Sequence, residues 1–189
     1  YMQRIRDAVK RMEMLVSDLS DISRIESGHF FMNETRVEIE DVMQAVRDNV
    51  ITQIRARNHA YVEQVKGKMP PLRVDFYRLL QVLTNLVSNA YKYTPDGGVI
   101  TLTVAQRDKR VEFSVQDTGI GLSEEAIEKL GTKFWRADDD FTRSQPGTGL
   151  GFAITSSLVR QMGGEILIES QVGRGSKFTF SVPIAEGNA

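Results

Sequence analysis

The stretch from Val99 to Asp117, "VITLTVAQRDKRVEFSVQD", decides the fold class that the sequence predicts. Each half alternates apolar and polar residues, which is the pattern of a strand with one buried face. Asp108 and Lys109 form a short turn between the halves. Because strands joined by so short a turn pair antiparallel, we expect a β-hairpin inside a larger sheet.

Helices and further strands are expected on both sides of this hairpin. Apolar residues at helical spacing predict helices over about 39–54 and from Asp75, the expected N-cap, to about Thr94. A short helix is expected from about Ser123, a loop over 134–147, and a longer helix over about 150–162. The remaining strands are expected at 30–37, 60–65, 72–74, 165–170 and 176–183. This order predicts an α+β fold: a two-layer sandwich of a mostly antiparallel mixed sheet with helices packed on one face.

One long amphipathic helix is expected before this sandwich, over residues 1–26. Its apolar residues recur in steps of three and four, and Ser23 alone breaks the set: Met2, Ile5, Val9, Met12, Val16, Leu19 and Ser23. Such a seam needs a partner helix, from this protein or from a second copy, because an isolated helix of this length is marginal in water. Ser27 and Gly28 end the helix.

Composition excludes several classes of function. With 24 basic and 25 acidic residues among 189, the net charge of -1 gives no electrostatic footprint for a nucleic acid partner. The absence of cysteine excludes disulfides, thiol catalysis and zinc–thiolate sites. No apolar window is long enough to span a bilayer. The start at Tyr1, without a signal-like segment, leads us to expect a piece of a longer protein.

The first candidate site segment is "LTNLVSNAYKYT", from Leu83 to Thr94. Spacings of four and three place Asn85, Asn89 and Lys92 on one face of the predicted helix. An amide oxygen is a suitable ligand for Mg²⁺, and a lysine is a suitable charge for phosphate. A solvated polar face explains the same pattern without any ligand.

The second segment is "DTGIGL", from Asp117 to Leu122. A carboxylate at a strand end can accept a hydrogen bond from an exocyclic amine, and Gly119 and Gly121 allow a flat ligand to approach closely. Taken alone, the segment is equally well a plain turn.

The third segment is "TKFWRADDD", which begins at Thr132. Phe134 and Trp135 are candidate anchors of a mobile loop, and Arg136 has the planar donor group that suits phosphate oxygens. The alternative is that the two aromatic side chains are simply buried.

The fourth segment is "GTGLGFAIT", from Gly147 to Thr155. Gly147, Gly149 and Gly151 precede a predicted helix, whose first N–H groups and positive dipole end would face an anion. Its G-x-G-x-G spacing matches neither the dinucleotide fingerprint nor the P-loop. The segment is therefore either a hinge or a phosphate cradle.

Taken together and in this order, the four segments resemble the N box, first glycine box, F box and second glycine box of sensor histidine kinases. The ATP-binding domain so implied is similar to those of the gyrase, chaperone and mismatch-repair ATPase superfamily. "LSDISRIESG" resembles the end of the second helix of the family's dimerisation and phosphoacceptor domain. The resemblance implies a partial dimerisation domain at 1–27, a linker at 28–34, the catalytic domain at 35–185 and a tail at 186–189.

The resemblance also implies a role for each site residue. Asn89 matches the Mg²⁺ ligand, Tyr93 lies against the adenine, and Asp117 selects it through its exocyclic amine. Three residues carry the catalytic role at the phosphates, with Arg136 approaching the γ-phosphate: Asn85, Lys92 and Arg136. The remaining cofactor-binding residues border the base pocket or form the lid hinge and the start of the phosphate-facing helix: Gly119, Gly121, Gly147, Thr148, Gly149, Leu150 and Gly151.

The implied reaction is transfer of the γ-phosphate of Mg-ATP to a histidine on a dimerisation helix, and then to an aspartate of a response regulator. Hydrolases of the superfamily carry a glutamate where this chain has Asn85, and an amide cannot act as a general base. The implied ligands and partners are ATP or ADP, Mg²⁺, the histidine-bearing helix, a receiver domain and a second copy in a homodimer. The implied location is cytoplasmic, with any membrane anchor of the parent protein upstream.

The acceptor histidine is expected to be absent from this chain. The histidines present, His29 and His59, lack an acidic neighbour and a place on the helical seam, so we expect both to be surface or structural residues. The chain should therefore not phosphorylate itself. Two alternatives stay open: a regulatory module that binds nucleotide without transfer, and an ATP-driven clamp of the same superfamily.

Overall fold

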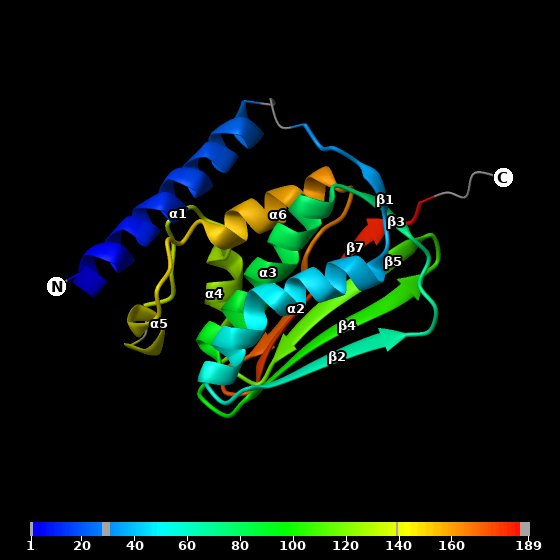
Figure 1. The fold of residues 1–189 in the computed structure, drawn as a ribbon. Coiled ribbons are helices and arrows are strands. Elements are labelled where there is room, and N and C mark those ends of the chain that lie inside the picture. The colour runs from blue at the N-terminus through cyan, green and yellow to red at the C-terminus, as the bar shows by residue number, and fades with distance from the viewer. Residues whose placement is uncertain (1, 28–30, 139, 186–189) are drawn as a thin grey trace.

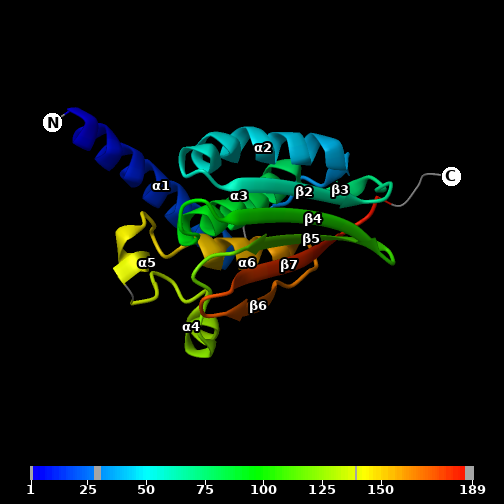
Figure 2. The ribbon, with the colours of Figure 1, turned by 90° about the horizontal axis from the view of Figure 1, so that it is seen from below.

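A five-stranded sheet forms one layer of the molecule in a computed structural model that describes residues 2–27, 31–138 and 140–185 (Figures 1 and 2). Its strand order is β2-β4-β5-β7-β6. These strands are β2 (Ala60–Lys66), β4 (Val99–Arg107), β5 (Arg110–Asp117), β6 (Leu167–Gln171) and β7 (Gly175–Pro183). All neighbouring pairs are antiparallel except β2 and β4, which are parallel. The mixed, mostly antiparallel sheet confirms the predicted fold class.

The predicted hairpin forms the centre of this sheet. β4 and β5 pair from Ile100 opposite Asp117 to Arg107 opposite Arg110. The turn between them places Asp108 at a φ of 53°, a left-handed conformation that Asp tolerates better than most residues. The short turn fixes the register of the two strands. In this register Asp117, the last residue of β5, lies opposite Ile100 near the start of β4.

Three helices cover one face of the sheet and enclose the core. They are α2 (Ile39–Ala56), α3 (Phe76–Tyr93) and α6 (Gly151–Gln161), and α3 packs between the other two (Figure 1). Asp75 caps α3 as predicted, because its carboxylate accepts a hydrogen bond from the Arg78 N–H at 3.2 Å. A small sheet of β1 (Thr35–Val37) and β3 (Leu72–Val74) lies beside this layer.

Two short helices complete the chain. α4 (Glu124–Lys129) confirms the short helix expected from about Ser123. Ser123 is its N-cap, because its hydroxyl accepts a hydrogen bond from the Ala126 N–H. α5 (Asp140–Ser144) lies inside the segment for which we predicted only a loop. That expectation was wrong because five residues of Asp, Phe, Thr, Arg and Ser carry no helical periodicity.

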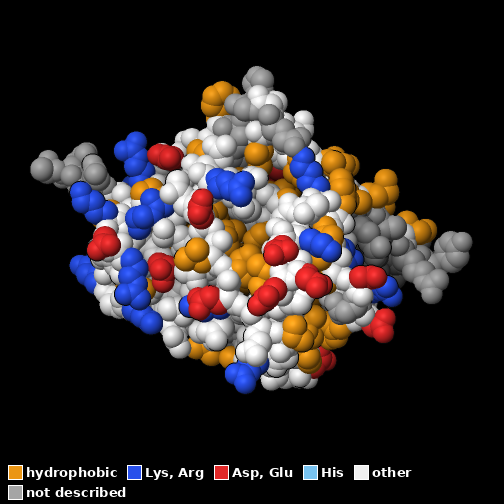
Figure 3. Space-filling model, turned by 180° about the vertical axis from the view of Figure 1, so that it is seen from behind, with side chains coloured by type: hydrophobic (Ala, Val, Ile, Leu, Met, Phe, Trp, Pro, Cys, Tyr) orange, Lys and Arg blue, Asp and Glu red, His pale blue; other side chains and the backbone are white. Residues whose placement is uncertain are grey.

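The long first helix, α1 (Met2–Glu26), lies outside the sandwich and touches it through its C-terminal half (Figure 1). Asp21 is only 9% exposed and accepts hydrogen bonds from Arg78 Nη1 at 3.2 Å and Gln81 Nε2 at 2.8 Å, while Ile22 joins the core. The predicted seam remains open to solvent, and hydrophobic side chains lie along the edge that α1 forms (Figure 3). Its described members are 49% to 67% exposed: Ile5, Val9, Met12, Val16 and Leu19.

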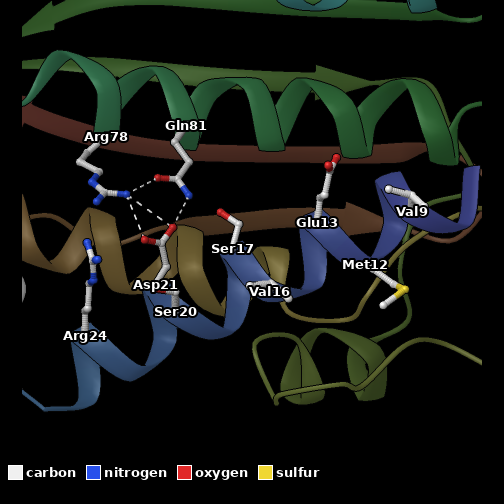
Figure 4. Close-up of a pocket in the computed structure, with 10 residues that line it drawn as sticks. All are labelled: Val9, Met12, Glu13, Val16, Ser17, Ser20, Asp21, Arg24, Arg78 and Gln81. Carbon is white, nitrogen blue, oxygen red and sulfur yellow. Dashed lines mark hydrogen bonds and ion pairs between the residues drawn. The ribbon is translucent and has the colours of Figure 1, made fainter. Parts of the chain in front are cut away.

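An open groove of about 920 Å³ separates α1 from α3 (Figure 4). Its walls combine the exposed seam with the ion pair that docks α1: Val9, Met12, Glu13, Val16, Ser17, Ser20, Asp21, Arg24, Arg78 and Gln81. None of the predicted site residues is among them, so this groove belongs to the docking of α1.

Candidate functional site

The last two turns of α3 carry Asn89, Lys92 and Tyr93. The apolar face of α3 is buried in the core through Leu83, Leu86 and other residues, so the opposite face turns toward the loops that follow β5 and precede α6. All three residues are half-buried. Within the described part of the chain, the Asn89 amide takes part in no hydrogen bond.

Asp117 ends β5 with its side chain nearly buried, 6% exposed. One carboxylate oxygen, Oδ1, accepts hydrogen bonds from the Gly119 N–H at 2.8 Å and the Ser176 N–H at 3.2 Å. Burial raises the pKa of Asp117 above its ordinary value, and the two backbone hydrogen bonds oppose that shift. The other oxygen, Oδ2, accepts no hydrogen bond from any residue that the structure describes.

The loop after β5 is bonded to the end of α3. The Ile120 N–H donates to the Tyr93 carbonyl at 3.1 Å, and a Cβ at Gly119 would lie only 2.4 Å from that same carbonyl oxygen. Gly119 is therefore required for this close approach. On the other side of the loop, the Gly173 N–H donates to the Ile120 carbonyl at 2.7 Å, and Gly121 lies against Gln171.

Asn85, one turn before Asn89, is bonded to the start of α6. Its amide nitrogen donates to the Thr155 hydroxyl, which in turn donates to the Gly151 carbonyl at 2.8 Å. A Cβ at Gly151 would lie 2.9 Å from Asn85 Oδ1. The structure thus places the Asn85 amide against α6, where it fixes the position of that helix relative to α3.

The loop between Phe134 and Gly149, which we name the lid, is closed at its base. The Phe134 N–H donates to the Gly149 carbonyl at 3.0 Å. Gly149 has a φ of 75°, and a Cβ there would lie 2.7 Å from the Phe134 carbonyl carbon. Trp135, the single tryptophan of the chain, is half-buried, whereas Phe134 is 61% exposed, so burial applies to only one of the two aromatic residues.

Arg136 holds the lid together from within. Its guanidinium donates to the backbone carbonyls of Thr142, Gln145 (2.7 Å) and Gly147 (3.4 Å). Its Nε is buried and has no hydrogen-bond partner among the described residues. The structure therefore uses Arg136 to shape the lid next to Gly147.

Lys92 and Arg136 bring two positive charges together. Burial lowers the pKa of Lys92, the neighbouring Arg136 lowers it further, and the carboxylate of Asp18 on α1 opposes them. The Thr148 hydroxyl donates to Asp18 Oδ2 at 3.0 Å and accepts from the Leu150 N–H at 3.2 Å. Burial raises the pKa of Asp18. A pair of cations beside a helix start is an arrangement that an anion stabilises.

All four predicted segments therefore meet in space. The helix end joins the loop after β5 at Tyr93, joins α6 at Asn85, and joins the lid through the charges of Lys92 and Arg136. The described residues include no group of three or more His, Asp or Glu side chains that could hold a metal ion by themselves.

One residue at this site, Arg57, was not found from the sequence. It follows α2, and its Nη1 donates to the Tyr91 carbonyl at the end of α3. His59 is buried, and its Nε2 lies 3.1 Å from the Thr94 carbonyl and 3.0 Å from that of Pro95. The structural role expected for His59 is confirmed, although it is not a surface residue. His29 lies outside the described residues.

A family model described as histidine kinase-, DNA gyrase B-, and HSP90-like ATPase matches residues 74–186. Sensor histidine kinase WalK of Bacillus subtilis (strain 168) is 32% identical over 96% of this chain and 30% of WalK. A crystal structure of full-length ShkA in complex with AMPPNP covers the whole chain and matches 39% of ShkA, with a TM-score of 0.88 and 29% identity. The fold is also similar to a crystal structure of histidine kinase ThkA in complex with response regulator protein TrrA. That match covers 98% of this chain and 51% of the matched chain, with a TM-score of 0.77 and 24% identity.

The chain belongs to the family of histidine kinase-, DNA gyrase B- and HSP90-like ATPases. Within that family it has the ATP-binding catalytic domain of histidine kinases. It spans only 30% of the length of WalK and 39% of ShkA. None of the helices that the structure describes is long and apolar enough to cross a membrane.

Proposed function

We propose that this chain binds Mg-ATP and presents the γ-phosphate to a histidine on a dimerisation helix of the parent protein. The observation that carries the proposal is that Arg136 donates to the carbonyl of Gly147, in the glycine-rich segment before α6, and acts electrostatically on Lys92 of α3, while the loop that follows the buried carboxylate of Asp117 is bonded to the end of the same helix. Cations at one end and an acceptor at the other suit a nucleotide's phosphates and its adenine amine.

Each end of the site has a proposed role. At the base end, Asp117 Oδ2 would accept a hydrogen bond from the exocyclic amine of adenine, while Tyr93 lies beside the base and Gly119 and Gly121 border it. At the phosphate end, Lys92, Arg136 and the N–H groups of the helix start would hold the phosphate oxygens.

The residues present also suit a metal ion bound together with the nucleotide. Asn89 supplies an amide oxygen with no competing partner in the described chain, and the phosphates would supply further oxygens. When bound, Mg²⁺ would neutralise phosphate charge and orient the γ-phosphate.

Asn85 supports transfer over hydrolysis. A glutamate at this position could activate water, whereas the Asn85 amide is already bonded to Thr155 and cannot accept a proton as a base. A site that aligns ATP without activating water depends on a positioned acceptor. This distinguishes the proposed kinase from an ATP-driven clamp.

We also propose the partners and the division of the chain. Residues 1–27 would be the second helix of a dimerisation domain, 28–34 a linker, 35–185 the catalytic domain and 186–189 a tail. The exposed seam of α1 supports a homodimeric parent protein whose bundle includes the histidine-bearing helix. A receiver domain, such as the one that ThkA's complex with TrrA suggests by analogy, would take the phosphoryl group from that histidine.

The test is phosphoryl transfer between two separately produced proteins. The chain is mixed with a histidine-bearing dimerisation domain of a relative and with γ-labelled ATP and Mg²⁺. We expect acid-labile, base-stable label on the dimerisation domain and none on the chain alone. Absence of label at saturating nucleotide would contradict the proposed transfer and favour a regulatory nucleotide-binding module.

A further inference from the structure

Arg57 belongs to none of the four sequence motifs, yet its side chain connects the end of α3, the turn after α3 and the lid. It follows the last residue of α2, and its side chain is 26% exposed. Its Nε donates to Asp96 Oδ1 at 2.9 Å, and its Nη1 lies 2.8 Å from the Tyr91 carbonyl, 3.1 Å from the Lys92 carbonyl and 3.3 Å from Gln145 Oε1. These partners belong to the end of α3, the turn that follows it, and the lid.

The contacts to α3 satisfy carbonyls that the helix itself leaves unpaired. The last turn of an α-helix has carbonyl groups without intrahelical partners. Arg57 covers those of Tyr91 and Lys92, and the Ile120 N–H covers that of Tyr93. A positive charge at a helix C-terminus is also favourable toward the dipole. Arg57 thereby fixes the backbone of the turn that carries Lys92.

The contact to the lid runs through Gln145. The backbone carbonyl of Gln145 accepts from Arg136 Nη2 at 2.7 Å, while its side-chain oxygen faces Arg57. Arg136 in turn lies close enough to Lys92 to lower the pKa of that lysine. Arg57, Gln145 and Arg136 therefore form a chain of contacts that holds the basic residue of the lid beside the basic residue of α3.

The Gln145 contact is the one best suited to open and close. A single guanidinium nitrogen carries two hydrogens, which here are shared among three acceptors. At 3.3 Å, Gln145 is the most distant of the three. The helix end can therefore stay bonded while the lid leaves.

We propose that Arg57 is a positioning residue of the nucleotide site, which holds the end of α3 in place and seats the lid on it through Gln145. The proposal rests on the proposed function in one respect, namely that this site binds a nucleotide. The contact between Arg57 and the lid is present in the protein without nucleotide. Arg57 acts through Lys92, Gln145 and Arg136 and does not itself touch the nucleotide.

Two variants separate the two tasks of Arg57. Arg57→Lys keeps the charge but lacks the planar fork that reaches Asp96 and the carbonyls together. Gln145→Ala leaves the end of α3 capped and removes the contact between the lid and Arg57, together with the bond from Gln145 Nε2 to the Ser144 hydroxyl inside the lid. Arg47→Ala is the matched control, because Arg47 is also an arginine of the α2 region, and it pairs with Glu63 away from the site.

The lid is followed through Trp135, the single tryptophan. In nucleotide-free protein, we expect Arg57→Lys and Gln145→Ala to increase acrylamide quenching of Trp135 and tryptic cleavage within the lid, and Arg47→Ala to change neither. Equal quenching and cleavage in all four proteins would overturn the seating of the lid, whether or not the wild type binds nucleotide.

Nucleotide affinity tests the other task. By calorimetry, we expect Arg57→Lys to weaken ADP binding on the order of tenfold, with Gln145→Ala weakening it less. Far-ultraviolet circular dichroism and the unfolding midpoint identify a variant that merely fails to fold. An ADP affinity of Arg57→Lys equal to that of Arg47→Ala would overturn the positioning role, whereas a wild type that binds no adenine nucleotide would contradict the proposed function instead.

Discussion

Replacing Asp117 by Asn separates what this carboxylate does for a ligand from what it does for the fold. Asp117 Oδ1 accepts both backbone hydrogen bonds, from Gly119 and Ser176. In the variant, the amide oxygen keeps those two bonds, so the amide nitrogen takes the place of Oδ2. A hydrogen-bond donor would then face the exocyclic amine of adenine, which is also a donor.

The expected loss of nucleotide affinity follows from that mismatch. A lost hydrogen bond in a buried site, with its donor left unsatisfied, costs about 1–3 kcal/mol, which corresponds to a roughly 5- to 150-fold increase in Kd. We expect an increase in Kd near the upper end of this range, because Asp117 is only 6% exposed and a hydrogen bond in such surroundings is stronger than one in water.

The stability of Asp117→Asn, relative to wild type, should depend on pH. Burial raises the folded-state pKa of Asp117 above its ordinary value of 3.8. A raised pKa means that the folded protein binds the proton more tightly than the unfolded chain, so this group's contribution is fully present below the ordinary value and is lost as pH rises through the folded-state pKa. The free energy of unfolding of Asp117→Asn, relative to wild type, should therefore rise between acidic and neutral pH.

Calorimetric titration with ADP and thermal unfolding at several pH values measure the two effects on the same samples. Asp108→Asn is the matched control, because Asp108 lies exposed in the turn of the same hairpin and Asn tolerates its φ of 53°. Unchanged affinity in Asp117→Asn would refute the adenine assignment. Lost affinity together with a large loss of stability at neutral pH would refute the separation of the two roles.

Two further predictions concern the phosphate end of the site. Asn89→Ala should remove the Mg²⁺ dependence of ATP binding, measured as affinity with and without a chelator, and a retained dependence would count against Asn89 as a metal ligand. Asp18→Asn should tighten ATP binding up to about fivefold in a titration, because it removes a negative charge beside the proposed phosphate positions, while Glu13→Gln, which removes a charge from the exposed face of α1, serves as control. Unchanged or weaker ATP binding by Asp18→Asn would refute the expected repulsion between the Asp18 carboxylate and the phosphates.

Local patterns in the sequence predicted most elements of the fold. The alternation around Asp108 gave the central hairpin, and Asp75 and Ser123 marked the starts of α3 and α4. The parallel pairing of β2 with β4 could not be predicted in this way, because it depends on how α2 and α3 pack across the sheet. Whether two strands pair in parallel is decided by tertiary structure, and a local sequence pattern contains no information about it.

The site was predictable as a set of segments but not as a set of contacts. Helical spacing placed Asn85, Asn89 and Lys92 on one face, yet it could not indicate that the Asn85 amide bonds to Thr155, 70 residues away in the chain. Arg57 carries no motif and lies before a strand, so nothing local marks it. Its contacts with α3 and the lid depend on the packing of three separate segments.

A crystal structure of this chain with AMPPNP and Mg²⁺ would locate the nucleotide. We expect the adenine amine within hydrogen-bond distance of Asp117, the metal on the Asn89 amide oxygen, and the phosphates between Lys92 and the N–H groups at the start of α6. A nucleotide bound elsewhere, such as in the groove between α1 and α3, or a base that makes no hydrogen bond to Asp117, would contradict the proposed site.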